Sequence, residues 1–263
     1  MLRKLMKYEF SATGRLLLPL FASLLIISIV NRLLVSLRLN APSAIGIAIS
    51  VILIVGILVL TLILMIQRFR QNLLSNEGYL MMTLPTRVDN IILSKLFTAT
   101  AWVLASFAVV TISILIMALT DFNFYDSFSS AVMFITDNTD LTSTQLVILA
   151  IETIVLFLIG SFSSIQLIYA CISLSMLVNK HRGLFTLGAF IVITTVMQTI
   201  SSILIAIASA IYMPDGFVQI LSRIGVFGVS QLAALLLFLS EAILCVIYYV
   251  VTRYMLKNRL NLQ

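Results

Sequence analysis

Charged side chains are the first thing that this sequence has little of. Asp, Glu, Lys and Arg make up 10% of its 263 residues, against roughly 25% in soluble globular domains. Apolar residues take their place, at 61% of the chain and a mean hydropathy of +1.17. A soluble fold of this length cannot hide so much apolar surface from water. The composition therefore excludes a soluble globular protein and predicts a protein embedded in a membrane.

The motifs of common catalytic sites are also missing. The sequence contains no GxxxxGK[ST] phosphate-binding loop, no HExxH metal motif and no CxxC pair. Its one histidine, His181, lies in the basic turn 180-KHR-182. From there it cannot act as the base for a serine nucleophile inside the bilayer. Cys171 and Cys245 both fall inside apolar segments, where cysteine behaves as a small hydrophobic residue. We therefore expect neither an enzyme nor a metal or cofactor site in this chain.

What the chain does contain is a series of long apolar segments. An apolar run of about 18 residues or more marks a helix that can cross a membrane. The predicted spans lie near residues 16–37, 44–66, 96–119, 145–178, 184–211 and 231–252. The fold class that we predict is all-α: a polytopic membrane protein with six transmembrane helices in a single transmembrane domain over residues 1–263.

Lys and Arg are unevenly distributed over the segments between these spans. Residues 120–143 carry several Asp but no Lys or Arg. Most of the basic residues lie in the two termini and in the segments that follow the second and fourth spans. Because Lys and Arg collect on the cytoplasmic side of membrane proteins, we predict that both termini are cytoplasmic and that residues 120–143 lie outside.

Three segments do not behave as simple spans. On a helical wheel over residues 1–15 the basic side chains share one face, which is typical of a helix lying in the membrane interface, although Glu9 falls on the apolar side without a partner that lipid can supply. The span 145–178 exceeds the roughly 30 Å of the hydrocarbon core, so it either projects into the cytoplasm or breaks near 160-GSFSS-164. Residues 212–230 predict a short re-entrant helical element on the outer side.

Ionisable residues inside the predicted spans are candidate functional residues. Glu241 lies about 18 Å along the last span from Arg253, at 1.5 Å per residue, which places it near the middle of the bilayer with no basic residue predicted at that depth. It is either protonated, hydrogen-bonded to a Ser, Thr or Gln side chain, or facing an aqueous or cargo cavity. Glu152 and Arg32 lie nearer the outer side at similar depth and are candidates for an ion pair.

The segment 75-SNEGYLMMTLPTR-87 is polar in an otherwise apolar chain. It follows the basic run 67-QRFRQ-71 on the predicted cytoplasmic side. The distribution of apolar and polar residues over 71–84 is compatible with a helix, which Pro85 ends because the residue before a proline is disfavoured in helix. We interpret the segment as a short helix that presents a polar ridge to the cytosol. A solvated linker is the alternative.

This segment also carries a family resemblance. The runs 77-EGYL-80 and 84-LPTR-87, with Lys95 downstream, resemble the inner-loop signature of ABC transporter permeases of the type-2 exporter class. That signature has an acidic residue, a Gly/Thr-Leu core, a Leu-x-x-Pro step and a Lys before the third span. The two ends, 7-KYEFSATGR-15 and 256-LKNRLNLQ-263, are similar to those of small bacterial permeases of the same class.

The resemblance implies a mechanism and a set of partners. Residues 71–84 would be a coupling helix that docks on a separate ATPase subunit. The residues implied in that contact are Asn76, Glu77, Gly78, Tyr79, Pro85 and Arg87. Two permease chains, identical or homologous, and two ATPase chains would form the transporter, with ATP and Mg²⁺ bound by the ATPases and no cofactor in this chain. The expected cargo is amphipathic (a peptide, antibiotic or lipid), the expected location is a bacterial plasma membrane, and nucleic acid is not expected as a partner.

Two other functions are compatible with the same sequence. A proton-coupled secondary transporter would use Glu241, although such folds commonly show internal repeats and helices broken near mid-membrane, which this sequence does not. A non-transporting immunity or sensor protein would use the permease scaffold without moving cargo. An adjacent gene for an ATPase with Walker motifs would favour the exporter.

Overall fold

The computed structural model of this chain describes residues 2–37, 40–74, 88–118, 129–130, 132–136, 141–178, 181–211 and 215–258. Every regular element in these ranges is a helix. Six of the helices are long and apolar enough to cross a membrane. The predicted all-α class and the predicted number of spans are therefore confirmed, and the chain is a multi-pass membrane protein.

The candidate spans all begin earlier than the sequence predicted. They are Arg3–Ser36, Pro42–Gln71, Val88–Ala118, Ser143–Leu177, Arg182–Ile203 and Phe227–Lys257. Hydropathy locates the part of a helix that suits lipid, whereas the backbone hydrogen bonds of a helix continue until a cap or a breaking residue ends them. The extra residues at the start of each span, from two at Pro42 to thirteen at Arg3, are therefore helix that the apolar pattern alone does not mark.

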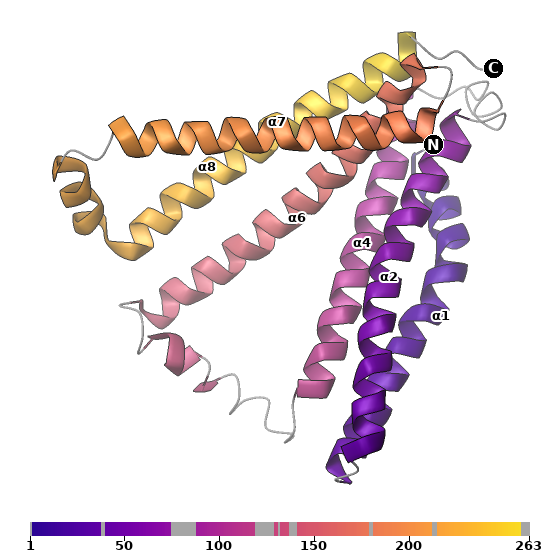
Figure 1. The fold of residues 1–263 in the computed structure, drawn as a ribbon, viewed down its shortest axis with the longest axis horizontal. Helices are drawn as coiled ribbons and strands as arrows, with labels where there is room; N and C mark the ends of the chain where they lie inside the picture. Colours follow the sequence, from indigo (N-terminus) through magenta and orange to yellow (C-terminus); the bar gives the residue numbers. More distant parts are fainter. Residues whose placement is uncertain are drawn as a thin grey trace. The chain divides into compact units, whose positions relative to one another are not determined.

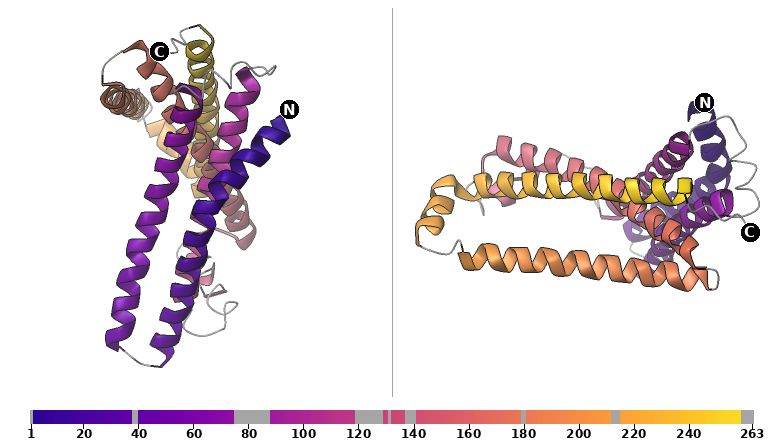
Figure 2. Two further views of the ribbon diagram at one scale, coloured as in Figure 1. Left: turned by 90° about the vertical axis from the view of Figure 1, so that its right-hand side faces the viewer. Right: turned by 90° about the horizontal axis from the view of Figure 1, so that it is seen from above.

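The first of two compact units in the chain contains three long helices. They are α1 (Leu2–Ser36), α2 (Asn40–Leu74) and α4 (Val88–Ala118), and each contacts the other two, as Figure 1 and the left view of Figure 2 show. Fully buried side chains from all three helices form the core of this unit, among them Leu17, Ile57, Phe69 and Leu96. The unit is thus a small helical bundle in its own right.

Hydroxyl groups reinforce this bundle inside the spans. Ser28 of α1 hydrogen-bonds to Ser113 of α4, and Thr61 of α2 hydrogen-bonds to Ser106 of α4 at 2.9 Å. All four side chains are buried. Because lipid tails are as apolar as the helices themselves, such interhelical hydrogen bonds and close packing hold membrane helices together. α4 is therefore joined to both of its neighbours by polar contacts within the apolar segments.

The N-terminal segment differs from its prediction. Residues 1–15 were predicted to form an interfacial helix of their own, but α1 runs without interruption from Leu2 to Ser36. This part of α1 packs on α4, because Gly14 lies against the Trp102 ring, where a Cβ would come within 3.2 Å. Pro19 lies inside α1, and the left view of Figure 2 shows that this helix bends, as prolines commonly cause. A contact of the first turns with headgroups stays a prediction.

A close approach between α1 and α2 gives the first testable prediction. A Cβ at Gly46 would lie 2.5 Å from Asn31 Oδ1 and 3.3 Å from Asn31 Cβ, and Asn31 is only 2% exposed. We expect Gly46→Ala to cost about 1–3 kcal/mol of unfolding free energy because it overpacks this contact. Gly56→Ala is the matched control, since no atom lies within 4 Å of its Cβ position. Chemical unfolding in mixed micelles measures both variants, and equal stability of the two contradicts the close approach.

The second compact unit contains α6 (Ser143–Leu174), the 3-10 helix η1 (Ser175–Leu177), α7 (Arg182–Ile211) and α8 (Asp215–Asn258). α6 and α8 pack along one another, and α7 contacts α6 and η1. In the right view of Figure 2 most of α7 runs apart from α8. α6 stays helical through residues 160–164, so the long fourth span does not break at that point.

α8 is two helical stretches joined at a glycine. Gly225 has φ 74° and ψ 171° inside the element, a conformation that glycine adopts readily because it has no Cβ. The element predicted over 212–230 is therefore helical from Asp215 and ends at this break, while residues 212–214 lie outside the described ranges. The position of this element on the outer side stays a prediction.

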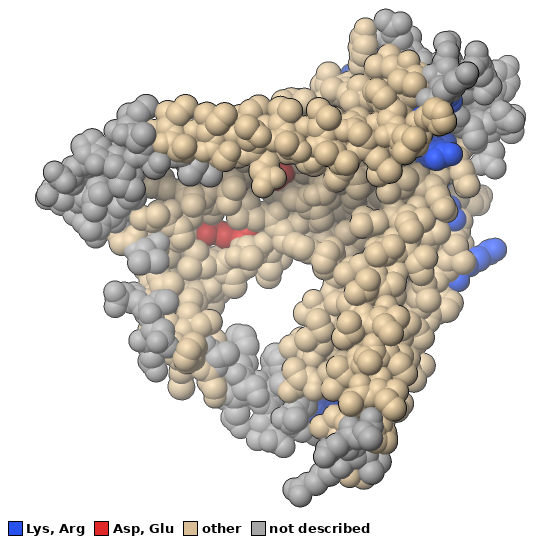
Figure 3. All heavy atoms as spheres, viewed as in Figure 1, with Lys and Arg blue, Asp and Glu red and all other residues tan. Residues whose placement is uncertain are grey.

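The surface of the described residues is overwhelmingly apolar. On the face drawn in Figure 3 very few charged atoms are visible. Large apolar side chains are exposed on helices of both units, for example Ile52 at 70%, Leu184 at 68% and Leu236 at 65%. Exposed apolar area on this scale is incompatible with water and fits contact with lipid.

Candidate functional site

Three helices of the first unit meet at one buried carboxylate. Lys95 of α4 donates a hydrogen bond from Nζ to Glu9 Oε1 of α1 at 2.7 Å. Arg68 of α2 places Nη1 3.4 Å from Glu9 Oε2. The side chains of Glu9 and Lys95 are 10% and 3% exposed, and that of Arg68 is 26% exposed. We call these three residues the Glu9 cluster.

Apolar residues that neighbour the cluster along α2 and α4 are buried. Ile91, Ile92 and Leu96 are buried around Lys95 on α4, and Phe69 is fully buried beside Arg68 on α2. In such surroundings a charge is stable only when a counter-charge and hydrogen bonds compensate for its lost hydration. The cluster therefore joins α1 to α4 by a buried ion pair, and Arg68 adds a longer, partly solvated contact from α2.

Further contacts hold the part of α1 that carries Glu9. Some lie within α1, and others pack α1 against α4. Thr13 donates its hydroxyl hydrogen to the backbone oxygen of Glu9 at 2.9 Å. Phe10 and Phe21 lie against Trp102 of α4, with ring centroids 5.8 and 6.1 Å apart. These contacts fix the position of α1 on α4 over several turns, so the Glu9 carboxylate is presented to Lys95 by a well-packed helix pair.

Two residues of the cluster lie near the helix ends that flank residues 75–87. Arg68 is in the second-last turn of α2, which ends at Leu74, and Lys95 is in the second turn of α4, which begins at Val88. The end of α2 and the start of α4, which flank the segment, are thus joined to each other through Glu9. A movement of the 75–87 segment would therefore act on two helix ends that this ion pair links.

The predicted contact residues themselves lie outside the described ranges. These residues are Asn76, Glu77, Gly78, Tyr79, Pro85 and Arg87. Of the predicted coupling helix 71–84, only residues 71–74 are described, and they form the end of α2. The docking surface on this segment therefore stays a prediction.

The sequence singles out two members of the cluster, but it does not predict their ion pair. Glu9 stood out as an acid on the apolar side of its helix, and Lys95 as the basic residue that follows the family signature. A carboxylate at an apolar position needs a buried cation, because its burial alone is prohibitively costly. This requirement could have predicted that Glu9 pairs with a basic residue on another helix.

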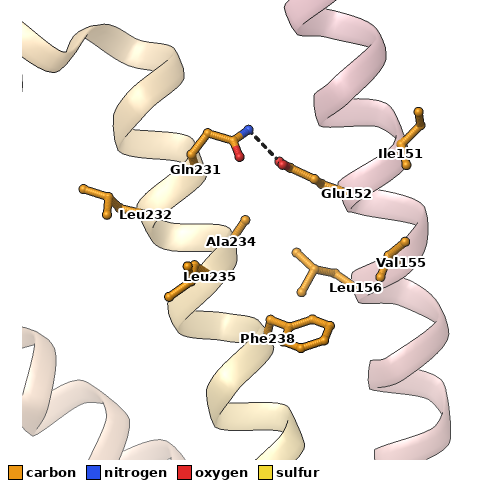
Figure 4. Close-up of a pocket in the computed structure, with 9 residues that line it drawn as sticks. All are labelled: Ile151, Glu152, Val155, Leu156, Gln231, Leu232, Ala234, Leu235 and Phe238. Carbon is orange, nitrogen blue, oxygen red and sulfur yellow. Dashed lines mark hydrogen bonds between the residues drawn. The ribbon is translucent and has the colours of Figure 1, made fainter.

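Of the three intramembrane candidates, Glu152 has a partner within its own unit. Gln231 of α8 donates a hydrogen bond from Nε2 to Glu152 Oε2 of α6 at 2.9 Å, as Figure 4 shows. Arg32 is half-buried on α1, in the other unit. The sequence did not predict the contact with Gln231, and an ion pair between Glu152 and Arg32 stays a prediction.

Glu241 is half-buried on α8. Within the described part of the chain its carboxylate makes no hydrogen bond and no ion pair. Of the three states predicted for it, the hydrogen bond to Ser, Thr or Gln is therefore not the one adopted there. A neutral acid and an acid facing a cavity remain as alternatives.

Metal chemistry and known relatives add no further guidance. Among the described residues no group of three or more His, Cys, Asp or Glu is placed to hold a metal ion. A scan against protein-family models, a search of curated proteins and a search of solved structures each found no match to this chain. The functional argument therefore rests on the geometry of the helices and on the residues of the 75–87 segment.

Proposed function

We propose that this chain is the transmembrane permease subunit of an ATP-driven ABC exporter in a bacterial plasma membrane. It acts with a separate ATPase subunit and a second, identical or homologous permease, and it moves an amphipathic cargo outward. The observation that carries the proposal is the Glu9 cluster, which joins the two helices flanking the 75–87 segment to each other and to α1. The resemblance of 77-EGYL-80, 84-LPTR-87 and Lys95 to the coupling region of such permeases supports it.

The cluster suits a chain that receives mechanical work from a partner. ATP would bind and hydrolyse on the ATPase, whose closure pushes on residues 75–87. Because Lys95 and Arg68 both bind Glu9, a push on this connection moves α1, α2 and α4 together instead of bending one helix away from its neighbours. Transmission of force requires this rigidity, since interfaces with well-packed cores switch between arrangements and do not deform continuously.

The orientation of the chain is part of the proposal and gives a second prediction. With the two native cysteines replaced by Ala, single cysteines are introduced at Asn138 or at Asn258. We expect a membrane-impermeant maleimide to label position 138 but not position 258 in intact cells, because the positive-inside bias places the C-terminus in the cytoplasm. Labelling at 258 and not at 138 places the 75–87 segment outside the cell and removes the proposed function.

Co-purification tests the proposed function as a whole. The tagged chain is produced with the ATPase encoded beside it, extracted in mild detergent and purified. We expect an ATPase with Walker motifs to be retained in stoichiometric amount, and reconstituted vesicles to move cargo only with hydrolysable ATP. Transport driven by a proton gradient without ATP favours the alternative that uses Glu241, and an ATPase-bound complex that moves no cargo favours the sensor or immunity alternative.

A further inference from the structure

A cavity of about 450 Å³ lies between α6 and α8 of the second unit. Its size falls in the usual range of small-molecule sites, roughly 300–1,000 Å³. Two of the side chains that line it are polar, Glu152 and Gln231, and the others are apolar. Figure 4 shows the polar pair together at one end, with Leu156, Ala234 and Phe238 extending away from it. The cavity is thus amphipathic along its length.

The polar end of this cavity offers a carboxyl group and an amide oxygen as hydrogen-bond acceptors. Gln231 uses Nε2 to bind Glu152 Oε2. Within the described residues the other carboxylate oxygen, Glu152 Oε1, and the amide oxygen, Gln231 Oε1, accept no hydrogen bond. None of the described residues that line the cavity is Lys, Arg or His. A ligand that completes this end therefore brings a positive charge and N–H donors.

The polar end of the cavity lies within a candidate membrane span. Glu152 lies about 14 Å along α6 from Ser143, at 1.5 Å per residue, inside the candidate span Ser143–Leu177. An ionised carboxylate at membrane depth is costly unless it is paired or hydrated. Gln231 supplies one neutral hydrogen bond, and none of the described residues that line the cavity is a cation.

We propose that this cavity binds an amphiphile with a primary ammonium head and a single hydrocarbon tail. The ammonium group carries three N–H donors, enough to reach Glu152 Oε1 and Gln231 Oε1 together in charge-assisted hydrogen bonds. The tail lies along Leu156, Ala234 and Phe238. The inference concerns binding by this chain alone, so it holds or fails independently of coupling to an ATPase.

The lining disfavours other amphiphiles. A carboxylate or phosphate head would face Glu152 with no cation in the cavity wall to receive it. A quaternary ammonium has charge but no N–H to donate. Among the described residues of the wall Phe238 is the one aromatic side chain, and one ring does not form the aromatic cage that such heads use. A neutral alcohol supplies one donor and leaves the carboxylate charge uncompensated.

Photolabelling of the full-length chain in phosphatidylcholine nanodiscs tests the proposal. The probe is a twelve-carbon primary alkylamine with a diazirine in its chain, used below its micellar concentration, and labelled peptides are mapped by mass spectrometry. We expect label on the α6 and α8 peptides that contain Glu152 and Ala234. Dodecylamine should displace the probe at least tenfold more effectively than dodecyltrimethylammonium, dodecanol or dodecanoate.

Variants assign the effect to the polar end of the cavity. Glu152→Gln preserves the size of the side chain and should weaken labelling at least tenfold, or about 1.4 kcal/mol, and Gln231→Met should weaken it as well. Asp89→Asn is the matched acid-to-amide control in the first unit and should label like the parent. Size-exclusion profiles and thermal transitions establish that the variants are folded.

Four results overturn the inference. They are equal labelling of the parent and of Glu152→Gln, equal displacement by dodecanol or dodecanoate, label that maps outside α6 and α8, and cross-linking of two chains through this cavity in place of probe. The first means that Glu152 is a neutral acid satisfied by Gln231, and the last means that a second copy of the chain fills the cavity.

Discussion

Replacing Lys95 with methionine is expected to lower the free energy of unfolding by about 3–5 kcal/mol, because it leaves the Glu9 carboxylate buried with its closest cation removed. Lys95 Nζ lies 2.7 Å from Glu9 Oε1, and its side chain is 3% exposed. Methionine keeps the length of the apolar stem, so the loss reports the charge and not a cavity. Chemical unfolding in mixed micelles, followed by the fluorescence of Trp102, measures it.

Arg68 provides the matched control for this prediction. Its guanidinium lies 3.4 Å from Glu9 Oε2 and its side chain is 26% exposed, so Arg68→Met should cost no more than about 1 kcal/mol, as partly solvated ion pairs do. In the double variant Glu9→Gln with Lys95→Met no buried charge is left over. We expect it to be more stable than Lys95→Met alone, which a double-mutant cycle expresses as a coupling energy.

One outcome of the double-mutant cycle contradicts the role of the Glu9 cluster. If Lys95→Met costs the same whether position 9 is Glu or Gln, the two side chains do not interact in the folded protein. The rigid connection between the helices that flank 75–87 would then have no ionic basis, and the proposed route for force would be lost.

The spans were predictable because lipid imposes a simple rule on sequence. Each crossing helix must present apolar side chains over about twenty residues, and this requirement is visible in composition alone. The spans depend on local sequence, and the structure confirms their number. The element predicted over 212–230 is helical from Asp215 in its described part, whereas the break at Gly225 was not predicted.

Features that depend on packing between distant residues were predicted incompletely. A helix over residues 1–15 was predicted, but its contacts with Trp102 and Lys95 of α4 were not, because no local pattern contains them. The hydrogen bond from Gln231 to Glu152 requires knowing that α6 and α8 are neighbours. A sequence shows that Glu9 and Glu152 need partners, but not which helix supplies them.

The second prediction with a large effect concerns the polar residues of 75–87. The double substitution Glu77→Ala with Tyr79→Ala is expected to weaken retention of the ATPase by more than tenfold. Truncating one side of a buried charged contact typically costs about 2–5 kcal/mol, and each 1.4 kcal/mol is a factor of ten in affinity. The variant should still insert and fold, because buried side chains of α1, α2 and α4 already form a core for the first unit.

Co-purification of the tagged variant with the ATPase measures this effect. Ser75→Ala lies in the same segment but outside the predicted contact, so it should retain the ATPase as the parent does. Unfolding of the double variant at the same denaturant concentration as the parent separates a lost contact from a damaged bundle.

ATP turnover in nanodiscs tests the central claim most directly. The ATPase is reconstituted with the parent chain, with the double variant at Glu77 and Tyr79, or without either. The account predicts that the parent changes the turnover rate and that the double variant leaves the rate of the ATPase alone unchanged. If the double variant binds the ATPase and changes its turnover as the parent does, residues 75–87 are a linker, and the coupling role proposed for this chain is contradicted.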